Sequence, residues 1–230
     1  MKLLIFDIDG TLTHLAGATR RAFDAAFLKI FGVSANIMGV KMHGRTDPMI
    51  FYDCYAQSGL DGDWRDAYQA FQPVYIEALP KQIAAATGAH LHAGVATLLK
   101  ELDQRKDRAA LALGTGNMEA GGRAKVGSFG LNQYFPVGGF GDHHEQRPEI
   151  IRDAVTNAEA HWRRTFNARH IWVIGDTEYD IDGGKALGLM TMGVATGGEY
   201  SVEQLTAVGA DAVFADFTDT AAVLRAFGLD

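Results

Sequence analysis

The chain has 230 residues, of which 47% are hydrophobic and 21% are charged, a composition close to that of ordinary globular proteins. This length fits one large domain or a core with a modest insert, and the composition excludes a disordered, collagen-like or coiled-coil chain. The formal net charge of −7 provides no basic surface of the kind that nucleic-acid backbones require, so we expect no nucleic-acid partner.

The chain has a single cysteine, Cys54, which excludes an intrachain disulfide and a cysteine-based metal cluster. The N-terminal apolar run ends at Asp7 and is far shorter than a signal peptide or the roughly 18 residues that span a bilayer. These features predict a cytoplasmic protein without a membrane partner, present as a monomer or a homodimer.

Five short apolar runs predict the strands of a parallel sheet. The first, Leu3–Ile8, is nearly continuous in apolar residues and leads into Asp-x-Asp-Gly, as a buried parallel strand does before a tight turn. Helical patterns separate the later runs, and this alternation predicts an α/β fold, with a Rossmann-like parallel sheet core flanked by helices. The later runs are Ala109–Leu113, His170–Ile174, Met190–Ala195 and Asp211–Phe214.

A long segment separates the first two predicted strands, and its length of about a hundred residues far exceeds that of a βα connection. It shows no convincing strand, and its aromatic residues favour helix–helix packing over ligand stacking. The second of its helices has Asp47 as the expected N-cap and Pro48 in the first turn. We therefore predict a core domain of residues 1–13 and 91–230 and a small all-helical domain of residues 14–90. The helices expected in this domain are 18–31, 47–58 and 63–79.

Two carboxylates leave the first predicted strand. Asp7 and Asp9 are followed by Gly10 and Thr11. In a parallel α/β sheet, ligands bind at the carboxyl ends of strands, and two neighbouring carboxylates there are costly unless a cation joins them. Taken alone, the pair fits a turn-forming or capping role equally well.

Two later strand ends also carry residues typical of binding sites, an anion-binding turn at one and a second pair of carboxylates at the other. After the second predicted strand, Thr115, Gly116 and Asn117 form a turn whose backbone N–H groups can approach an anion at a helix start, although a plain strand-to-helix turn has the same composition. After the third, Asp176 and Asp180 lie on one side of a turn and its opening helix. Acidic residues at two of three strand ends favour a functional site over separate structural roles.

These motifs, in this order along the whole chain, resemble the haloacid dehalogenase superfamily, and the helical insert resembles the cap domain of its phosphoglycolate phosphatase and β-phosphoglucomutase branch. The resemblance implies an Mg²⁺-dependent phosphatase that hydrolyses a small phosphomonoester through a phosphoaspartate. The alternatives are a phosphomutase of the β-phosphoglucomutase type and, from another class, a non-catalytic phosphorylatable receiver-like protein. The motifs are Asp7-Ile-Asp9-Gly10-Thr11-Leu12, then Thr115, a basic residue, and Gly175-Asp176-x-x-x-Asp180.

The resemblance also implies roles for individual residues. Asp7 would attack the phosphorus, and Asp9 would donate a proton to the leaving oxygen and later accept one from water. Mg²⁺ would be held by Asp7, the backbone carbonyl of Asp9 and Asp176, with Asp180 orienting metal-bound water. The residues expected at the phosphate are Gly10, Thr115, Gly116, Asn117 and a cation.

A basic residue is required because a phosphate dianion beside Asp7 and Asp176 would stay negatively charged even with Mg²⁺ present. Like charges about 4 Å apart cost roughly 4 kcal/mol at an effective dielectric of 20. The branch usually has a lysine followed by proline before the last motif, whereas this chain has Arg147 there. We favour Lys125, on the helix after the second strand, because arginine is bulkier and geometrically stricter, and Arg147 is the alternative as a bidentate fork.

The turn before the second predicted helix holds the candidates for substrate specificity. In the resembling branch a glycine-containing cap loop reads the leaving group, so Gly44 would let the backbone approach and Arg45 would offer a fork to a carboxylate or second phosphate. A surface arginine near a helix start is the alternative. His14 and His43 lie where the insert meets the core, and His43 is the second specificity candidate.

Overall fold

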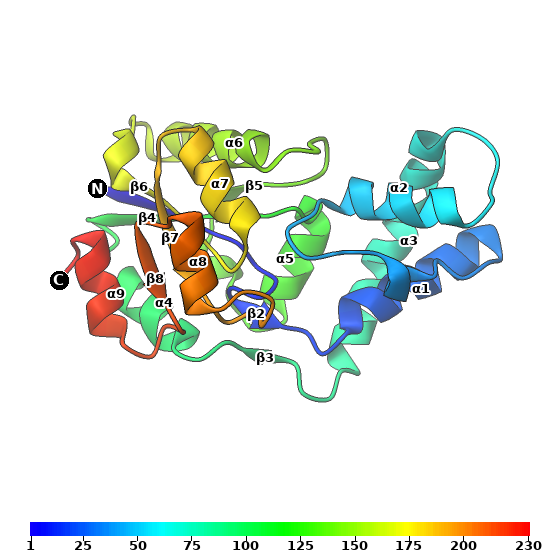
Figure 1. The fold of residues 1–230 in the computed structure, drawn as a ribbon, viewed down its shortest axis with the longest axis horizontal. Coiled ribbons are helices and arrows are strands. Elements are labelled where there is room, and N and C mark those ends of the chain that lie inside the picture. The colour runs from blue at the N-terminus through cyan, green and yellow to red at the C-terminus, as the bar shows by residue number, and fades with distance from the viewer.

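The computed structural model describes residues 1–230 and contains a six-stranded parallel sheet. Its strand order is β5-β4-β1-β6-β7-β8, so β1 is central, and the sheet confirms the predicted Rossmann-like α/β fold (Figure 1). All five predicted strands lie within two residues of an observed strand at each end, the largest difference being that β1 stops at Phe6, whereas the three-residue strand β5 was not predicted. The strands are β1 (Lys2–Phe6), β4 (Ala109–Gly114), β5 (Val137–Gly139), β6 (Ile171–Gly175), β7 (Met190–Val194) and β8 (Ala212–Phe214).

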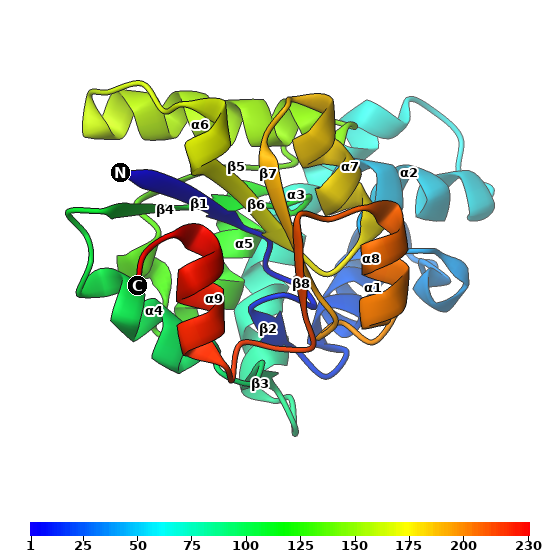
Figure 2. The same cartoon turned by 60° about the vertical axis from the view of Figure 1, so that its left-hand side comes forward.

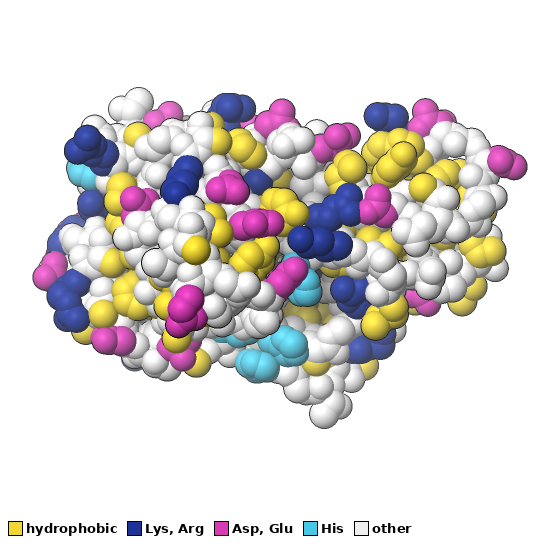
Figure 3. All heavy atoms as spheres, viewed as in Figure 1, with side chains coloured by type: hydrophobic (Ala, Val, Ile, Leu, Met, Phe, Trp, Pro, Cys, Tyr) yellow, Lys and Arg dark blue, Asp and Glu magenta, His cyan; other side chains and the backbone are white.

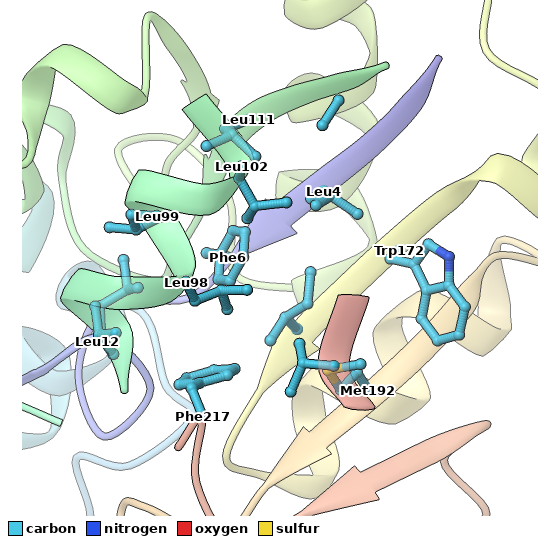
Figure 4. Close-up of a cluster of buried hydrophobic side chains, with 14 of the residues drawn as sticks. Leu4, Phe6, Leu12, Leu98, Leu99, Leu102, Leu111, Trp172, Met192 and Phe217 are labelled. Carbon is cyan, nitrogen blue, oxygen red and sulfur yellow. The ribbon is translucent and has the colours of Figure 1, made fainter. Parts of the chain in front are cut away.

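Helices cover both faces of the sheet, because its central strands are apolar on both sides (Figure 2). Leu3 and Ile5 belong to a buried cluster with residues of α6. Leu4 and Phe6 point to the opposite face, where Phe6 lies against the leucines of α4 (Figure 4). The helices of this part of the chain are α4 (Val95–Asp103), α5 (Glu119–Gly127), α6 (Arg147–Trp162), α7 (Glu178–Ala186), α8 (Val202–Val208) and α9 (Thr220–Phe227), with 3₁₀ turns at Asn132–Tyr134 and Ala168–His170.

The insert forms three helices at the other end of the long axis of the molecule (Figure 1). They enclose an aromatic cluster in which the rings of Phe23 and Phe51 lie 4.6 and 4.9 Å from that of Phe71, so the packing interpretation of the aromatics is confirmed. The last helix runs past its predicted end, because Leu79 and Ile83, one turn apart, are both buried in this cluster. The helices are α1 (Ala18–Phe31), α2 (Asp47–Gln57) and α3 (Trp64–Ala84), with a 3₁₀ turn at Ile37–Gly39.

A short antiparallel ribbon joins the insert to the sheet. Its strands are β2 (Thr13–His14) and β3 (His90–Leu91), and they pair where the chain enters and leaves the insert. The expectation of no strand in residues 14–90 is therefore wrong at the two ends of that range, since two-residue strands are too short to produce a hydropathy pattern. No helix of the chain combines the length and hydropathy that crossing a bilayer requires.

Candidate active site

The three strands that end in the predicted motifs are neighbours in the sheet, in the order β4-β1-β6. Parallel strands place their carboxyl ends at one edge, so Thr115, Asp7 and Asp176 meet there. A cavity of about 210 Å³ opens at this edge and is lined from both the sheet and the insert. Its lining includes Asp7, Asp9, Gly10, Thr115, Gly116, Asn117, Lys125 and Arg147 from the sheet side, and His43, Gly44 and Arg45 from the insert.

Three buried carboxylates converge beside the cavity. Oxygens of Asp7, Asp176 and Asp180 all lie within 4.8 Å of one another. Burial raises the pKa of Asp7 to about 7, with Arg147 opposing the shift and Asp180 adding to it. Burial and the nearby carboxylates of Asp180 and Asp7 also raise the pKa of Asp176 well above its ordinary value. The cluster therefore holds more negative charge than its own surroundings compensate.

The contacts of the Asp176 carboxylate indicate which kind of ligand would balance the charge of this cluster. Its Oδ1 accepts a hydrogen bond of 3.1 Å from the Thr11 hydroxyl, whereas its buried Oδ2 has no hydrogen-bond partner. A buried, unpartnered carboxylate oxygen within an all-oxygen cluster fits a hard divalent cation such as Mg²⁺. Gly10 has a φ of 81°, and a Cβ there would lie 2.2 Å from Asp176 Oδ2, so the turn after β1 requires glycine to close on this carboxylate.

The two buried cations, Lys125 and Arg147, form ion pairs with different carboxylates. The Lys125 amine donates to Asp9 Oδ2 at 2.6 Å and to Asn117 Oδ1 at 2.5 Å. Arg147 Nη1 lies 3.5 Å from Asp7 Oδ1, and its Nη2 lies 3.4 Å from Asp180 Oδ1. Lys125 was the preferred candidate for the cation beside Asp7, but in the structure Arg147 contacts Asp7 and Lys125 contacts Asp9. The reason is that the helices carrying them, α5 and α6, pack on opposite faces of the sheet.

Thr115 and Asn117 connect the two carboxylates that follow β1. The Thr115 side chain opposes the rise in the pKa of Asp7. Asn117 Nδ2 donates to Asp9 Oδ2 at 2.8 Å and to Thr115 Oγ1 at 2.7 Å. The Asp9 side chain is still 41% exposed, in contrast to the buried Asp7. Asp9 is thus held in place by two donors and remains accessible from the cavity.

Backbone contacts bring the insert onto the turn that contains Gly116. The N–H of Asp47 donates to the Gly116 carbonyl at 2.9 Å, and Asp47 Oδ2 accepts from the N–H of Met118 at 2.9 Å. A Cβ on Gly116 would lie 2.2 Å from the Arg45 carbonyl oxygen, so glycine permits this approach. The prediction of Asp47 as the N-cap of α2 is wrong, because Thr46 occupies that position and Asp47 is turned toward the sheet domain.

The two specificity candidates, Arg45 and His43, line the cavity, and each lies beside a carboxylate. Arg45, which precedes α2, forms an ion pair with Asp53 in the second turn of that helix. His43 Nδ1 lies 3.1 Å from an oxygen of Glu199, which follows β7. Sequence reasoning missed Glu199 because nothing in its local pattern marks a residue that will face the insert. It also missed Asp47 as a contact residue, since an Asp-Pro pair at a helix start is typical of a cap.

Comparison with known proteins adds independent findings. Residues 1–188 match the family model of haloacid dehalogenase-like hydrolases. Solved structures with similar folds include a predicted phosphoglycolate phosphatase from Haemophilus somnus (16% identity, TM-score 0.71, 97% of each chain covered) and CbbY from Rhodobacter sphaeroides in complex with phosphate (20%, 0.67, 95% of this chain and 96% of that one). A candidate β-phosphoglucomutase from Thermotoga maritima is also similar (18%, 0.61, 98% and 99%). No curated protein matches the sequence.

Proposed function

This chain belongs to the haloacid dehalogenase-like hydrolase family, and we propose that it is an Mg²⁺-dependent phosphatase that hydrolyses a small phosphomonoester through a phosphoaspartate at Asp7. The observation that carries the proposal is the accessible Asp9 beside a buried Asp7 that sits within the acidic cluster. A cavity of about 210 Å³ supports a small substrate, since pockets for drug-sized ligands run to about 300–1,000 Å³.

Each residue has a definite task in this chemistry. A carboxylate oxygen of Asp7 forms a bond to phosphorus while the ester P–O bond breaks, and Asp9 donates its proton to the departing oxygen. Water then attacks the phosphorus of the acyl phosphate and gives a proton to Asp9, which releases inorganic phosphate and regenerates Asp7. Thr115, Gly116 and the turn after them would bind the phosphate oxygens.

The charges around Asp7 explain why cations are needed. With a pKa of about 7, the Asp7 carboxyl is only partly ionised at neutral pH. Mg²⁺ held by Asp7, Asp176 and the Asp9 carbonyl would supply positive charge that keeps Asp7 ionised and neutralises the phosphate. Arg147 contributes a fixed positive charge on the same carboxylate, and Lys125 contributes one beside Asp9.

We also propose that residues 14–90 act as the cap domain, with Arg45 and His43 facing the leaving group. A phosphomutase would use the same nucleophile but needs a free cation for a second phosphate. For that role Arg45 would have to leave Asp53, which hydrolysis of the ester does not itself require, and this favours the phosphatase. Membership of a hydrolase family argues against a non-catalytic receiver.

Turnover of para-nitrophenyl phosphate, with and without Mg²⁺, tests the proposal. The wild-type chain should release nitrophenol only with a divalent cation, and Asp7→Asn should reduce the rate to background while leaving the circular dichroism spectrum unchanged. A panel of small phosphorylated metabolites would then identify the substrate, with Arg45→Ala affecting the preferred ester more than the aryl phosphate. Equal activity of wild type and Asp7→Asn would overturn the mechanism.

A further inference from the structure

Three histidines share one face of the ribbon that joins the insert to the sheet. His14 and His90 are directly opposite each other in the β2–β3 register, and His92 is two residues beyond His90. Side chains at such positions point to the same side of a ribbon. In the view of Figure 3, histidine side chains gather on the surface over β2 and β3. The proposed phosphatase chemistry uses none of these three imidazoles.

The spacing of the three rings is close to that of a metal site, although two of the three distances are wider. An imidazole bound to zinc has a Zn–N distance of about 2.0–2.1 Å, so the centres of rings in a tetrahedral site lie about 5 Å apart. The ring centres of His14 and His90 are 5.1 Å apart, those of His90 and His92 are 5.8 Å apart, and those of His14 and His92 are 6.3 Å apart. Small side-chain rotations would therefore bring the rings to ligand spacing.

The protonation of the rings also suits a metal. His90 Nδ1 lies 2.8 Å from the Gly88 carbonyl oxygen, which can only accept, so Nδ1 carries the hydrogen and Nε2 presents its lone pair. The Nε2 of His92 is buried without a hydrogen-bond partner.

We propose that His14, His90 and His92 form a second metal site, at the hinge of the insert, that takes a borderline transition cation such as Zn²⁺. Three imidazole nitrogens suit Zn²⁺ and exclude Mg²⁺, which prefers the carboxylate oxygens of the acidic cluster. The ring nitrogens are not gathered as closely as the oxygens of that cluster, and the exposed ring of His14 has room to rotate toward His90 and His92. A bound cation would link the two strands that connect the insert to the sheet.

Titration with Zn²⁺ tests the site. The chain carries no polyhistidine tag, is first stripped of transition metals, and is kept in excess Mg²⁺ so that the acidic cluster is occupied. Calorimetry gives the number of bound Zn²⁺ ions, and the ring protons of the histidines, followed by NMR, report which side chains bind. We expect the signals of His14, His90 and His92 to shift together as one Zn²⁺ binds. The shifts and the bound ion should be lost in the double variant H14N/H90N, whose two positions are exposed.

Two control proteins separate this site from others. H143N/H170N removes two exposed histidines elsewhere and should bind Zn²⁺ as the wild type does. Asp176→Asn removes a carboxylate of the acidic cluster and should also keep the histidine shifts. The absence of Zn²⁺ uptake by the wild type, or uptake that survives in H14N/H90N and is lost in Asp176→Asn, would overturn the proposal. Matching thermal unfolding of the metal-free variants would show that the chain still folds.

Discussion

The two walls of the cavity are built in different ways. The sheet wall is rich in buried charge, since Asp7, Lys125 and Arg147 line it and are all less than a tenth exposed. The insert wall consists of partly exposed ion pairs, such as Arg45 with Asp53, whose side chains are 24% and 29% exposed, and of backbone atoms that contact the Gly116 turn. Buried charges interact strongly and cannot move without large cost, whereas partly exposed pairs can exchange partners more readily. In the proposed phosphatase, this difference assigns the chemistry to the sheet wall and substrate selection to the insert wall.

Arg147→Ala tests whether the sheet wall depends on buried charge. The change leaves Asp7 and Asp180 without their cation, and breaking a buried pair from one side costs about 3–5 kcal/mol. We expect that decrease in the free energy of urea unfolding, with loss of phosphatase activity. Lys81→Ala is the matched control, because its pair with Glu77 is exposed and should contribute under about 1 kcal/mol.

Lys125→Ala provides the comparison within the same wall. Its partner Asp9 is 41% exposed, so water can solvate the carboxylate after the lysine is removed. This variant should be less destabilised than Arg147→Ala while losing catalytic rate through Asp9. Equal destabilisation of Arg147→Ala and Lys81→Ala would contradict the account of the sheet wall.

Asp47→Ala tests the contact between the two walls. Hydrogen bonds to charged groups contribute about 1.5–3 kcal/mol, and this change removes the acceptor for the Met118 N–H. We expect a higher KM and faster hydrogen exchange at the Met118 amide, as the insert separates more readily from the sheet. Asp47→Asn keeps an acceptor oxygen and should show a smaller effect. Unchanged exchange in Asp47→Ala would show that this bond does not hold the walls together.

The smallest expected effect on the sheet wall is the pH dependence of the increase in Tm that Mg²⁺ produces. The pKa of Asp7 is about 7 in the folded chain and 3.8 without the fold, so the folded state holds a proton that the unfolded chain releases. This contribution favours the folded state at low pH and is lost as the pH rises through about 7. Mg²⁺ competes with that proton, so it should raise the Tm more at pH 8 than at pH 5. The same Tm increase at both values would be inconsistent with a metal bound by Asp7.

The sheet wall was largely predictable from the sequence, because its residues follow directly from strand ends. Asp7, Thr115 and Asp176 each come one residue after a recognisable apolar strand, and parallel pairing brings such positions together. The choice between Lys125 and Arg147 was not predictable, because it depends on which face of the sheet each helix covers.

The insert wall depends on contacts between distant parts of the chain. Asp47 and Met118 are 71 residues apart, and local patterns carry no information about their pairing. The β2–β3 ribbon escaped prediction for a related reason, since each strand has only two residues and is defined by its partner. Glu199 was missed because its contact with His43 exists only when the insert rests on the sheet domain.

The most direct test of the phosphatase proposal is to find the phosphoryl group on the protein. The wild-type chain, acid-quenched during turnover of an aryl phosphate with Mg²⁺, would be digested and its peptides weighed by mass spectrometry. We predict one added phosphoryl group on the peptide that contains Asp7, and none on that peptide from Asp7→Asn. A phosphoryl group on any other residue, or turnover with no phosphorylated peptide at all, would contradict the role of Asp7 as the nucleophile.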